Sequence, residues 1–367
     1  MLCLTHLPPP VNGVTVMSQH VVNSHELRLH FDIDVLPIRS AASISDIGKL
    51  RVAKVFGILS LVWRLFVRAL THKPDLVYFT LTPNGMAFYR DVLYVALMKL
   101  SGARRIYHLH GKGVDKALTN PLTLALYKWV FRGAEVILLS PSLYADSARV
   151  VRREQCHFLA NGIPDPWDGR DYRDDRSCRI DTPRIVFFSN LVVNKGIFVL
   201  LEALALLKIR GVPFRASFVG AWESASVEQE FGRIVREKAL HDLVEVRGPR
   251  HGEEKRQAYA EADIMAFPTY NDSYPLVVLE AMSHALPVIS TYEGAIPEIL
   301  ADNITGFLVP RMDALTTADR LELLLTDPAL RERMGKAGRK RYLSKFTLRH
   351  FEENLRNILE KCLAKNK

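Results

Sequence analysis

The positions best suited to chemistry in this sequence follow directly after apolar runs. Lys195-Gly196 comes after the run that ends near residue 190. A glycine at a strand-to-helix turn lets backbone N–H groups approach an anion, and the ammonium adds a mobile positive charge that suits phosphate. Asn12-Gly13 stands at a similar turn after the first apolar run. Each turn fits an anion site, although an exposed lysine, or a proline-rich stretch that simply ends a strand, would give the same letters.

Two histidines, His108 and His110, end the apolar run 104–110. Alternation along a strand turns both side chains to the same face, and open α/β sheets bind ligands at the carboxyl ends of parallel strands. We expect the pair to hydrogen-bond a substrate, and two buried, internally bonded imidazoles are the alternative. A metal pair would need a third ligand, which the sequence does not indicate, so no metal site is predicted.

Two carboxylates, Asp272 and Glu280, follow the apolar run 264–268. Asp272 falls in a loop and Glu280 inside a helix opened by Pro275, so the two do not share one helix face. They can still flank one ligand. Glu280 stands among apolar residues, where a carboxylate needs a hydrogen-bonding partner, and the diol of a ribose would be one.

The elements that must position these residues alternate along the whole chain, with β-type apolar runs separated by longer helical patterns. This is typical of parallel sheets covered by helices on both faces, so the predicted fold class is α/β with two doubly wound parallel sheets. A polar linker is expected at 161–183. The predicted strands are 1–6, 31–38, 75–81, 104–110, 135–140 and 156–160, then 184–190, 215–220, 244–248, 264–268, 287–291 and 306–309. The predicted helices include 14–27, 44–71, 85–101, 115–132, 142–153, 313–326, 328–344 and 347–364.

Composition narrows the class of protein. The 367 residues carry a net charge of +9, and 48% are hydrophobic, which indicates a globular protein with affinity for an anion. The basic residues are scattered, so a nucleic acid is not the expected partner. Four cysteines without a CxxC pair favour a reducing, cytoplasmic setting over a zinc ribbon or a disulfide framework. Residues 1–25 fit neither a membrane span nor a signal peptide, and the P-loop pattern is absent.

The segment 44–71 is predicted as a basic amphipathic helix, with Lys54, Arg64 and Arg68 on one side. It has two interpretations. One is a helix that covers the sheet and exposes a cationic stripe. The other is a helix that rests on an anionic membrane surface, with Trp63 and the arginines at the level of the headgroups.

Taken together, these segments resemble the retaining nucleotide-sugar glycosyltransferases of family 4, the group 1 glycosyltransferases with the GT-B fold. The resemblance covers nearly the whole chain. It implies two Rossmann-like domains facing a central cleft: an acceptor-binding domain at 1–164 and a donor-binding domain at 165–345, with a C-terminal helix at 346–367 packing back on the first. It is carried by the loop 8–13, His110, Asn161-Gly162-Ile163, Lys195-Gly196, Asp272-x7-Glu280, Gly294-x-x-Pro297-Glu298 and Gly306-Phe-Leu-Val-Pro310.

The resemblance also implies the role of each site residue. His110 would bond the transferred sugar, Lys195 would neutralise the diphosphate leaving group, and Asp272 would lie beside the sugar. Glu280 would hold the ribose hydroxyls. Further donor contacts are expected from Gly13, Asn190, Ser273, Tyr274 and Leu276, and acceptor contacts from Asn12 and His108.

The implied reaction transfers a sugar from a nucleoside diphosphate donor, UDP- or GDP-linked, to an acceptor hydroxyl with retention of anomeric configuration, without a metal or cofactor. The acceptor would be a glycan, or a lipid-linked glycan in surface polysaccharide assembly. The protein would then be cytoplasmic, with peripheral attachment to the inner face of the cell membrane through 44–71.

Two positions depart from the family pattern. Asn190 stands where the family has an arginine, so it donates only neutral hydrogen bonds, and Asp272 replaces a glutamate. The missing arginine keeps a second function open, a non-catalytic protein that binds nucleotide-sugars. A nucleotide-sugar epimerase with the same fold is the other alternative, and it would pass the sugar to no acceptor.

Overall fold

The computed structural model describes residues 1–38, 52–71, 73–167 and 182–364. These form two compact units, one from Met1–Asn161 with Leu348–Lys367 and the other from Gly162–Thr347. Each unit has one parallel six-stranded sheet, so the predicted α/β class is confirmed. Within the described residues, no helix combines the length and apolar character needed to cross a membrane.

The sheet of the first unit has the strand order β2-β1-β3-β4-β5-β6. Its central strands are buried along most of their length, as expected when helices cover both faces. The strands are β1 (Leu2–His6), β2 (Asp34–Ile38), β3 (Leu76–Phe79), β4 (Arg104–Leu109), β5 (Glu135–Leu138) and β6 (Cys156–Phe158). The helices are α1 (Gly13–Asn23), α2 (His25–His30), α3 (Val52–Thr71), α4 (Gly85–Leu100), α5 (Val114–Ala117), α6 (Pro121–Phe131) and α14 (Leu348–Ala364), with 3₁₀ turns η2 (Pro141–Asp146) and η3 (Arg153–Gln155).

The sheet of the second unit has the order β12-β11-β10-β7-β8-β9. Its strands are β7 (Arg184–Phe188), β8 (Arg215–Val219), β9 (Val244–Gly248), β10 (Ile264–Phe267), β11 (Val288–Thr291) and β12 (Gly306–Val309). Its helices are α7 (Ile197–Ile209), α8 (Ala225–Glu237), α9 (Gly252–Glu261), α10 (Leu276–Ser283), α11 (Ile296–Ile299), α12 (Ala314–Thr326) and α13 (Pro328–Lys345), with a 3₁₀ turn η5 (Val193–Lys195). Every predicted strand is therefore present, most with ends one to three residues shorter.

The predicted helices differ from the structure at three places, each explained by local hydrogen bonds. The helix predicted at 14–27 ends early because the Ser24 side chain accepts from Leu27 N and starts α2. The helix predicted at 115–132 is split, since Asn120 caps α6. The segment 142–153 is not an α-helix: η2 and the turns after it close i→i+3 bonds, such as Ser147 N to Tyr144 O. The predicted residues 44–51 lie outside the described residues.

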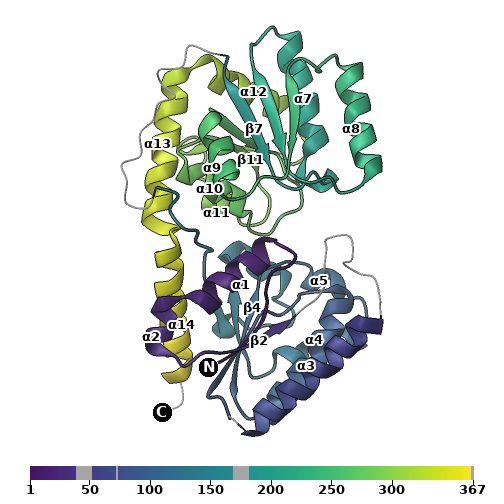
Figure 1. The fold of residues 1–367 in the computed structure, drawn as a ribbon, viewed down its shortest axis with the longest axis vertical. Helices are drawn as coiled ribbons and strands as arrows, with labels where there is room; N and C mark the ends of the chain where they lie inside the picture. Colours follow the sequence, from purple (N-terminus) through teal and green to yellow (C-terminus); the bar gives the residue numbers. More distant parts are fainter. Residues whose placement is uncertain (39–51, 72, 168–181, 365–367) are drawn as a thin grey trace. The chain divides into compact units, whose positions relative to one another are not determined.

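Helix α3 lies beside α4 (Figure 1) and has two apolar faces. Leu61 and Leu65 point into the core of the first unit, at 6% and 1% exposure. Of the predicted cationic stripe, Arg64 is exposed. Arg68 pairs with Asp34 at 3.0 Å, and the side chain of Lys54 lies outside the described residues. The exposed face also carries Phe56, Leu59, Trp63 and Phe66, and α4 adds Met86, Tyr89 and Leu93.

Candidate functional site

Both sheets place polar residues at the point where strand order reverses. In the second unit the neighbours β7 and β10 continue to opposite sides of the sheet, which is where doubly wound folds bind ligands. The loop after β7 brings Lys195 and the loop after β10 brings Asp272. Lys195 Nζ lies 2.6 Å from Asp272 Oδ2 and donates to Asn271 O at 3.2 Å. Two predicted site residues from distant parts of the sequence are thus in direct contact.

Gly196 makes this contact possible. Its φ is +86°, and a Cβ built there would lie 2.1 Å from the carbonyl oxygen of Pro268. The two loops are bonded to each other, because Asn194 O accepts from Tyr270 N at 3.0 Å and from Thr269 Oγ1 at 3.2 Å. Only glycine combines the left-handed conformation with so close a backbone approach. Gly196 therefore fixes the position of the Lys195 ammonium beside the loop after β10.

The loop that carries Asp272 is held from two further directions. Asp272 Oδ1 accepts from Tyr274 N at 3.2 Å, and Asp272 N donates to Glu293 Oε1 at 3.3 Å. Glu293 is only 2% exposed and pairs with Arg311 at 3.0 Å. Gly294 has φ +53°, and a Cβ there would lie 2.3 Å from Asp272 O. Sequence reasoning missed Glu293, and its one signal is a charged residue two positions after the end of the buried strand β11.

Glu280 has its hydrogen-bonding partners inside the protein. Its Oε1 lies 2.5 Å from Lys255 Nζ, and its Oε2 accepts from Tyr259 OH at 2.9 Å. Burial, and then the neighbouring carboxylate, raise the pKa of Tyr259 well above its usual value, so the phenol stays a donor. Glu280 therefore has two partners within the chain, and its contact with the ribose hydroxyls stays a prediction. Sequence reasoning missed Lys255, although Lys255 and Tyr259 are one helical turn apart on α9 and so lie on the same face of that helix.

The other predicted donor residues surround this edge of the sheet. Asn190 is exposed just after β7, and Ser273 O accepts from Ala295 N at 2.9 Å. Tyr274 is buried, and its OH is among the buried atoms for which no partner is seen in the described residues. Leu276 begins α10 after Pro275, and the first N–H groups of a helix have no acceptor within it.

In the first unit, the strand order reverses at β1. The loops after β1, β3 and β4 enclose a cavity of about 290 Å³. The predicted residues Asn12 and His110 line it, and Gly13 lies between the lining residues Asn12 and Val14. The Asn12 side chain is partly committed, because its Oδ1 caps α1 by accepting from Thr15 N at 3.1 Å.

His6 also lines this cavity and was missed by sequence reasoning. Its Nε2 is 3.1 Å from Arg90 Nη2, and its Nδ1 is 3.1 Å from Thr80 Oγ1. A guanidinium only donates, so Nε2 accepts and Nδ1 carries the proton. Burial and then Arg90 lower the pKa of His6 to about 3. His6 is therefore a neutral imidazole of fixed tautomer.

His108 and His110 do share one face, with ring centroids 3.9 Å apart. His108 is fully buried, and its Nδ1 lies 2.6 Å from Tyr78 OH. It does not line the cavity. This favours the alternative of a buried, hydrogen-bonded imidazole beside His110, and the contact of His108 with an acceptor stays a prediction. Burial lowers the pKa of His110 to about 4, and no partner for its Nε2 is seen in the described residues.

Comparison with known proteins finds similarity to glycosyltransferases. Residues 171–341, less than half of the chain, match the family model "Glycosyl transferases group 1". The chain is 34% identical over 177 residues to a D-inositol 3-phosphate glycosyltransferase of Corynebacterium aurimucosum, covering 46% of this chain and 42% of that protein. It is 31% identical over 145 residues to the putative colanic acid biosynthesis glycosyltransferase WcaL of Escherichia coli, covering 37% and 34%. The matched parts thus span less than half of these relatives.

The fold comparison extends over the whole chain. The solved structure of Anabaena Alr3699/HepE in complex with UDP superposes with a TM-score of 0.76 at 17% identity, covering 98% of this chain and 99% of that one. This likeness shows the fold: two parallel-sheet α/β units, as in structural neighbours with the GT-B fold.

Proposed function

We propose that this protein transfers a sugar from a nucleoside diphosphate donor to an acceptor hydroxyl in polysaccharide assembly. The family match over residues 171–341 supports glycosyl transfer. The name of the WcaL relative supports a polysaccharide setting, and the UDP complex of Alr3699/HepE supports a nucleotide-sugar donor. The observation that carries the proposal is the contact between Lys195 and Asp272 at the switch point of the second sheet.

In the proposed reaction Lys195 stabilises the departing diphosphate. An ammonium has three N–H donors, and Asp272 and the carbonyl of Asn271 occupy two. The third is directed to a phosphate oxygen, and the N-terminus of α10 adds a partial positive charge. Stabilisation of charge that develops in the transition state then supplies much of the rate, with no divalent metal required. Glu280 binds the ribose hydroxyls, sharing its carboxylate with Lys255 and Tyr259.

The acceptor, in this proposal, binds in the cavity of the first unit. The Nε2 of His110 provides a hydrogen-bonding atom toward a sugar or acceptor hydroxyl, and Gly13 allows close approach to the start of α1. Reaction on one face of the sugar retains the anomeric configuration without an enzymatic nucleophile. Product analysis distinguishes this reaction from the alternatives: an epimerase changes the donor sugar without using an acceptor, and a binding protein yields no product.

We further propose that the acceptor is lipid-linked and that the protein meets it at an anionic membrane surface. The support is the exposed apolar face of α3, where Phe56 and Trp63 are 68% and 64% exposed. Trp63 and Phe66 lie together, with ring centroids 6.0 Å apart, and Arg64 is exposed beside them. Aromatic side chains next to a cation suit the interface between headgroups and acyl chains.

The donor site is tested first by thermal denaturation with UDP, GDP, ADP, CMP and dTDP. One diphosphate should raise the melting temperature by about 3 °C at 100 times its Kd. Glu280→Ala should abolish most of this rise. Glu280→Gln, which keeps an acceptor for Tyr259, should weaken binding about tenfold. The matched control is Glu254→Ala, an exposed carboxylate on α9 whose salt-bridge partner is Arg250. A chain that no nucleotide stabilises would contradict the proposal.

Membrane binding is tested by flotation with vesicles of phosphatidylcholine and phosphatidylglycerol. The double variant Trp63→Ser/Phe66→Ser should lose most binding, and Arg64→Gln should reduce it. Leu122→Ser is the control, since Leu122 is 83% exposed on α6. If the double variant floats as well as the unaltered protein, the α3 surface is not the membrane contact.

A further inference from the structure

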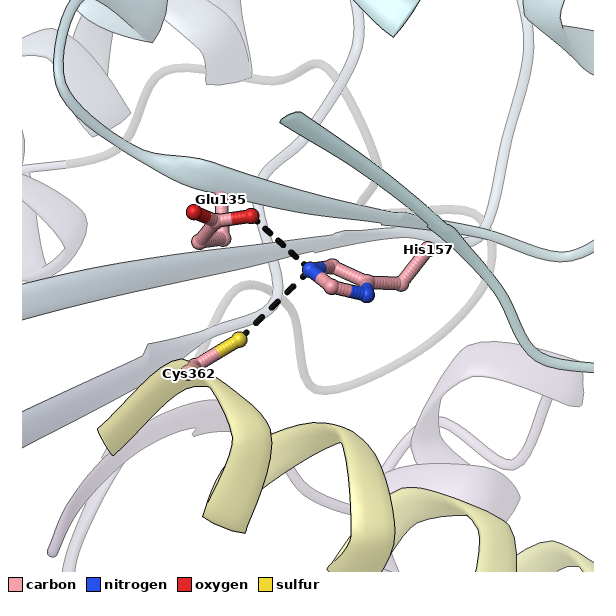
Figure 2. A group of neighbouring side chains, drawn as sticks. All are labelled: Glu135, His157 and Cys362. Carbon is pink, nitrogen blue, oxygen red and sulfur yellow. Dashed lines mark hydrogen bonds and ion pairs between the residues drawn. The ribbon is translucent and has the colours of Figure 1, made fainter. Parts of the chain in front are cut away.

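Three side chains from distant parts of the sequence meet at the amino-terminal edge of the first sheet (Figure 2). Glu135 begins β5, His157 is the second residue of β6, and Cys362 lies in the last turn of α14. We propose that these three residues bind a divalent transition-metal ion, with Zn²⁺ as the expected occupant. The site lies at the opposite edge of the sheet from His110, so it is separate from the proposed acceptor cavity and does not rest on the proposed function.

The geometry is that of ligands gathered around one point. His157 Nε2 lies 2.8 Å from Glu135 Oε2 and 3.5 Å from Cys362 Sγ. The three ligand atoms all lie within 4.8 Å of one another. A proton relay would place the carboxylate on one ring nitrogen and the thiol on the other. Here both approach the same nitrogen, as Figure 2 shows, which is the arrangement expected of three metal ligands.

Only small side-chain movements would admit the ion. Zinc sits about 2.3 Å from sulfur and about 2.0–2.2 Å from imidazole nitrogen and carboxylate oxygen, so tetrahedral ligands lie roughly 3.3–3.7 Å apart. The observed separation of Nε2 and Sγ is already in that range. Glu135 needs to withdraw by a fraction of an ångström, and its side chain, 24% exposed, has room to do so. A water molecule would complete the coordination on this more open side.

The sulfur is held in place independently of any ion. Arg104 on β4 donates to the carbonyl oxygen of Cys362, at 2.6 Å, and to that of Leu363. The last turn of α14 is therefore fixed against the sheet, and Cys362 is 4% exposed. A preformed position for the least accessible ligand lowers the ordering cost of binding.

The donor set selects the kind of ion. Thiolate and imidazole together favour borderline and soft ions such as Zn²⁺ and Co²⁺, whereas Mg²⁺ and Ca²⁺ prefer oxygen ligands alone. Binding requires the thiolate, so the thiol proton leaves to solvent, and it requires the His157 tautomer whose proton is on Nδ1. The ion would then link α14 directly to strands β5 and β6.

The test titrates the full-length, chelator-treated protein with Co²⁺ and then Zn²⁺. We expect one Co²⁺ per chain, with a thiolate-to-cobalt charge-transfer absorption that Zn²⁺ removes by displacement. Excess Zn²⁺ should also raise the melting temperature, since an ion that binds only the folded state stabilises it. Cys362→Ser should lose the charge-transfer band, and Glu135→Gln should weaken Co²⁺ binding at least tenfold.

The matched control is Cys156→Ser, the residue next to His157 on β6, whose thiol donates to Arg152 O. This variant should keep the band and the response to Zn²⁺. Circular dichroism of each variant checks that the fold is retained, and Glu135→Gln preserves side-chain volume if Cys362→Ser does not fold. The proposal is overturned if the unaltered protein gives no saturable thiolate band, or if the band survives in Cys362→Ser. It is equally overturned if Cys156→Ser removes the band.

Discussion

The carboxyl edges of the two sheets share one architecture and differ in charge. In the first unit, the edge is lined by neutral imidazoles, because burial lowers the pKa of His6 to about 3 and that of His110 to about 4. In the second unit, the edge carries ion pairs, Lys195 with Asp272 and Lys255 with Glu280. The same strand reversal therefore presents neutral imidazoles in one unit, with the Arg90–Asp91 ion pair behind His6, and pairs of lysine with carboxylate in the other.

This difference fits the proposed reaction, in which the acceptor binds to the first unit and the donor to the second. Uncharged imidazole nitrogens suit the hydroxyls of a sugar or an acceptor, which carry no charge at neutral pH. Ammonium groups held beside carboxylates suit a diphosphate and a ribose, since one group meets the phosphate oxygens and the other the hydroxyls. The comparison can be tested by changing one charged residue, Lys195, and one neutral residue, His110. The first change should lower turnover, and the second should alter how stability depends on pH.

The largest effect is expected from Lys195→Ala. This change removes the cation proposed to stabilise the leaving diphosphate, so turnover should fall by about 10²–10³-fold. Steady-state kinetics with the donor identified by thermal denaturation measure this. The control is Lys208→Ala on α7, whose ammonium donates to the carbonyl of Ala239 at 2.6 Å and should leave turnover unchanged. If Lys195→Ala keeps full turnover, the ammonium of Lys195 does not stabilise the leaving diphosphate.

A second prediction concerns pH. Above about pH 6.5 His6 and His110 are neutral in both the folded and unfolded chain. Below about pH 6.5 the two imidazoles bind protons in the unfolded chain. In the folded chain they stay neutral until the pH falls to their lowered pKa values. The free energy of unfolding should therefore fall as pH decreases from 6.5 to 4, by at most about 1.4 kcal/mol per pH unit for each histidine.

The measurement is denaturant unfolding of the unaltered protein and His110→Gln at several pH values in that window. As pH decreases, the stability of His110→Gln should fall less steeply than that of the unaltered protein. The stability of His251→Gln, at the exposed start of α9, should fall as steeply as that of the unaltered protein. If the loss is equally steep in His110→Gln, the imidazole of His110 is not the neutral, buried group on which the comparison depends.

The smallest effect is expected from Asn190→Arg. Asn190 is exposed beside the charged edge, where an added guanidinium would reach a diphosphate. Donor affinity should rise about fivefold, equivalent to about 1 kcal/mol for a solvent-exposed charge pair. Calorimetric titration with the preferred nucleotide measures it, and Asn190→Gln is the control for side-chain length. Unchanged affinity in Asn190→Arg would place the diphosphate away from residue 190.

Sequence patterns predicted the elements well where a buried parallel strand leaves a near-continuous apolar run. They also placed Lys195 and Asp272 in the loops after β7 and β10, which the topology of the second sheet brings together, and His110 directly after β4 of the first sheet. Lys255 was not predictable, since its partnership with Glu280 depends on how α9 packs beside α10. In the sequence, nothing distinguishes His6 from any other last residue of a strand. Its fixed tautomer depends on the contact with Arg90, which only the structure shows.

The cluster of Glu135, His157 and Cys362 could not be predicted for a different reason. Its members are too far apart in the sequence to form a spacing motif, and Cys362 comes beside the other two only because α14 returns to the first unit. The predicted helix at 14–27 failed through a single side chain, since Ser24 satisfies a backbone donor better than a continued helix does.

The return of α14 has a consequence for biosynthesis. The ribosome makes strands β4 to β6 first, then the whole of the second unit, and only afterwards the helix that belongs with those strands. The first unit therefore stays incomplete while the second unit is made. Until α14 is made, the positions that Phe351, Leu355 and Leu359 occupy in the first unit are unfilled. A pause or premature stop before residue 348 would release a chain whose second unit is complete and whose first is not.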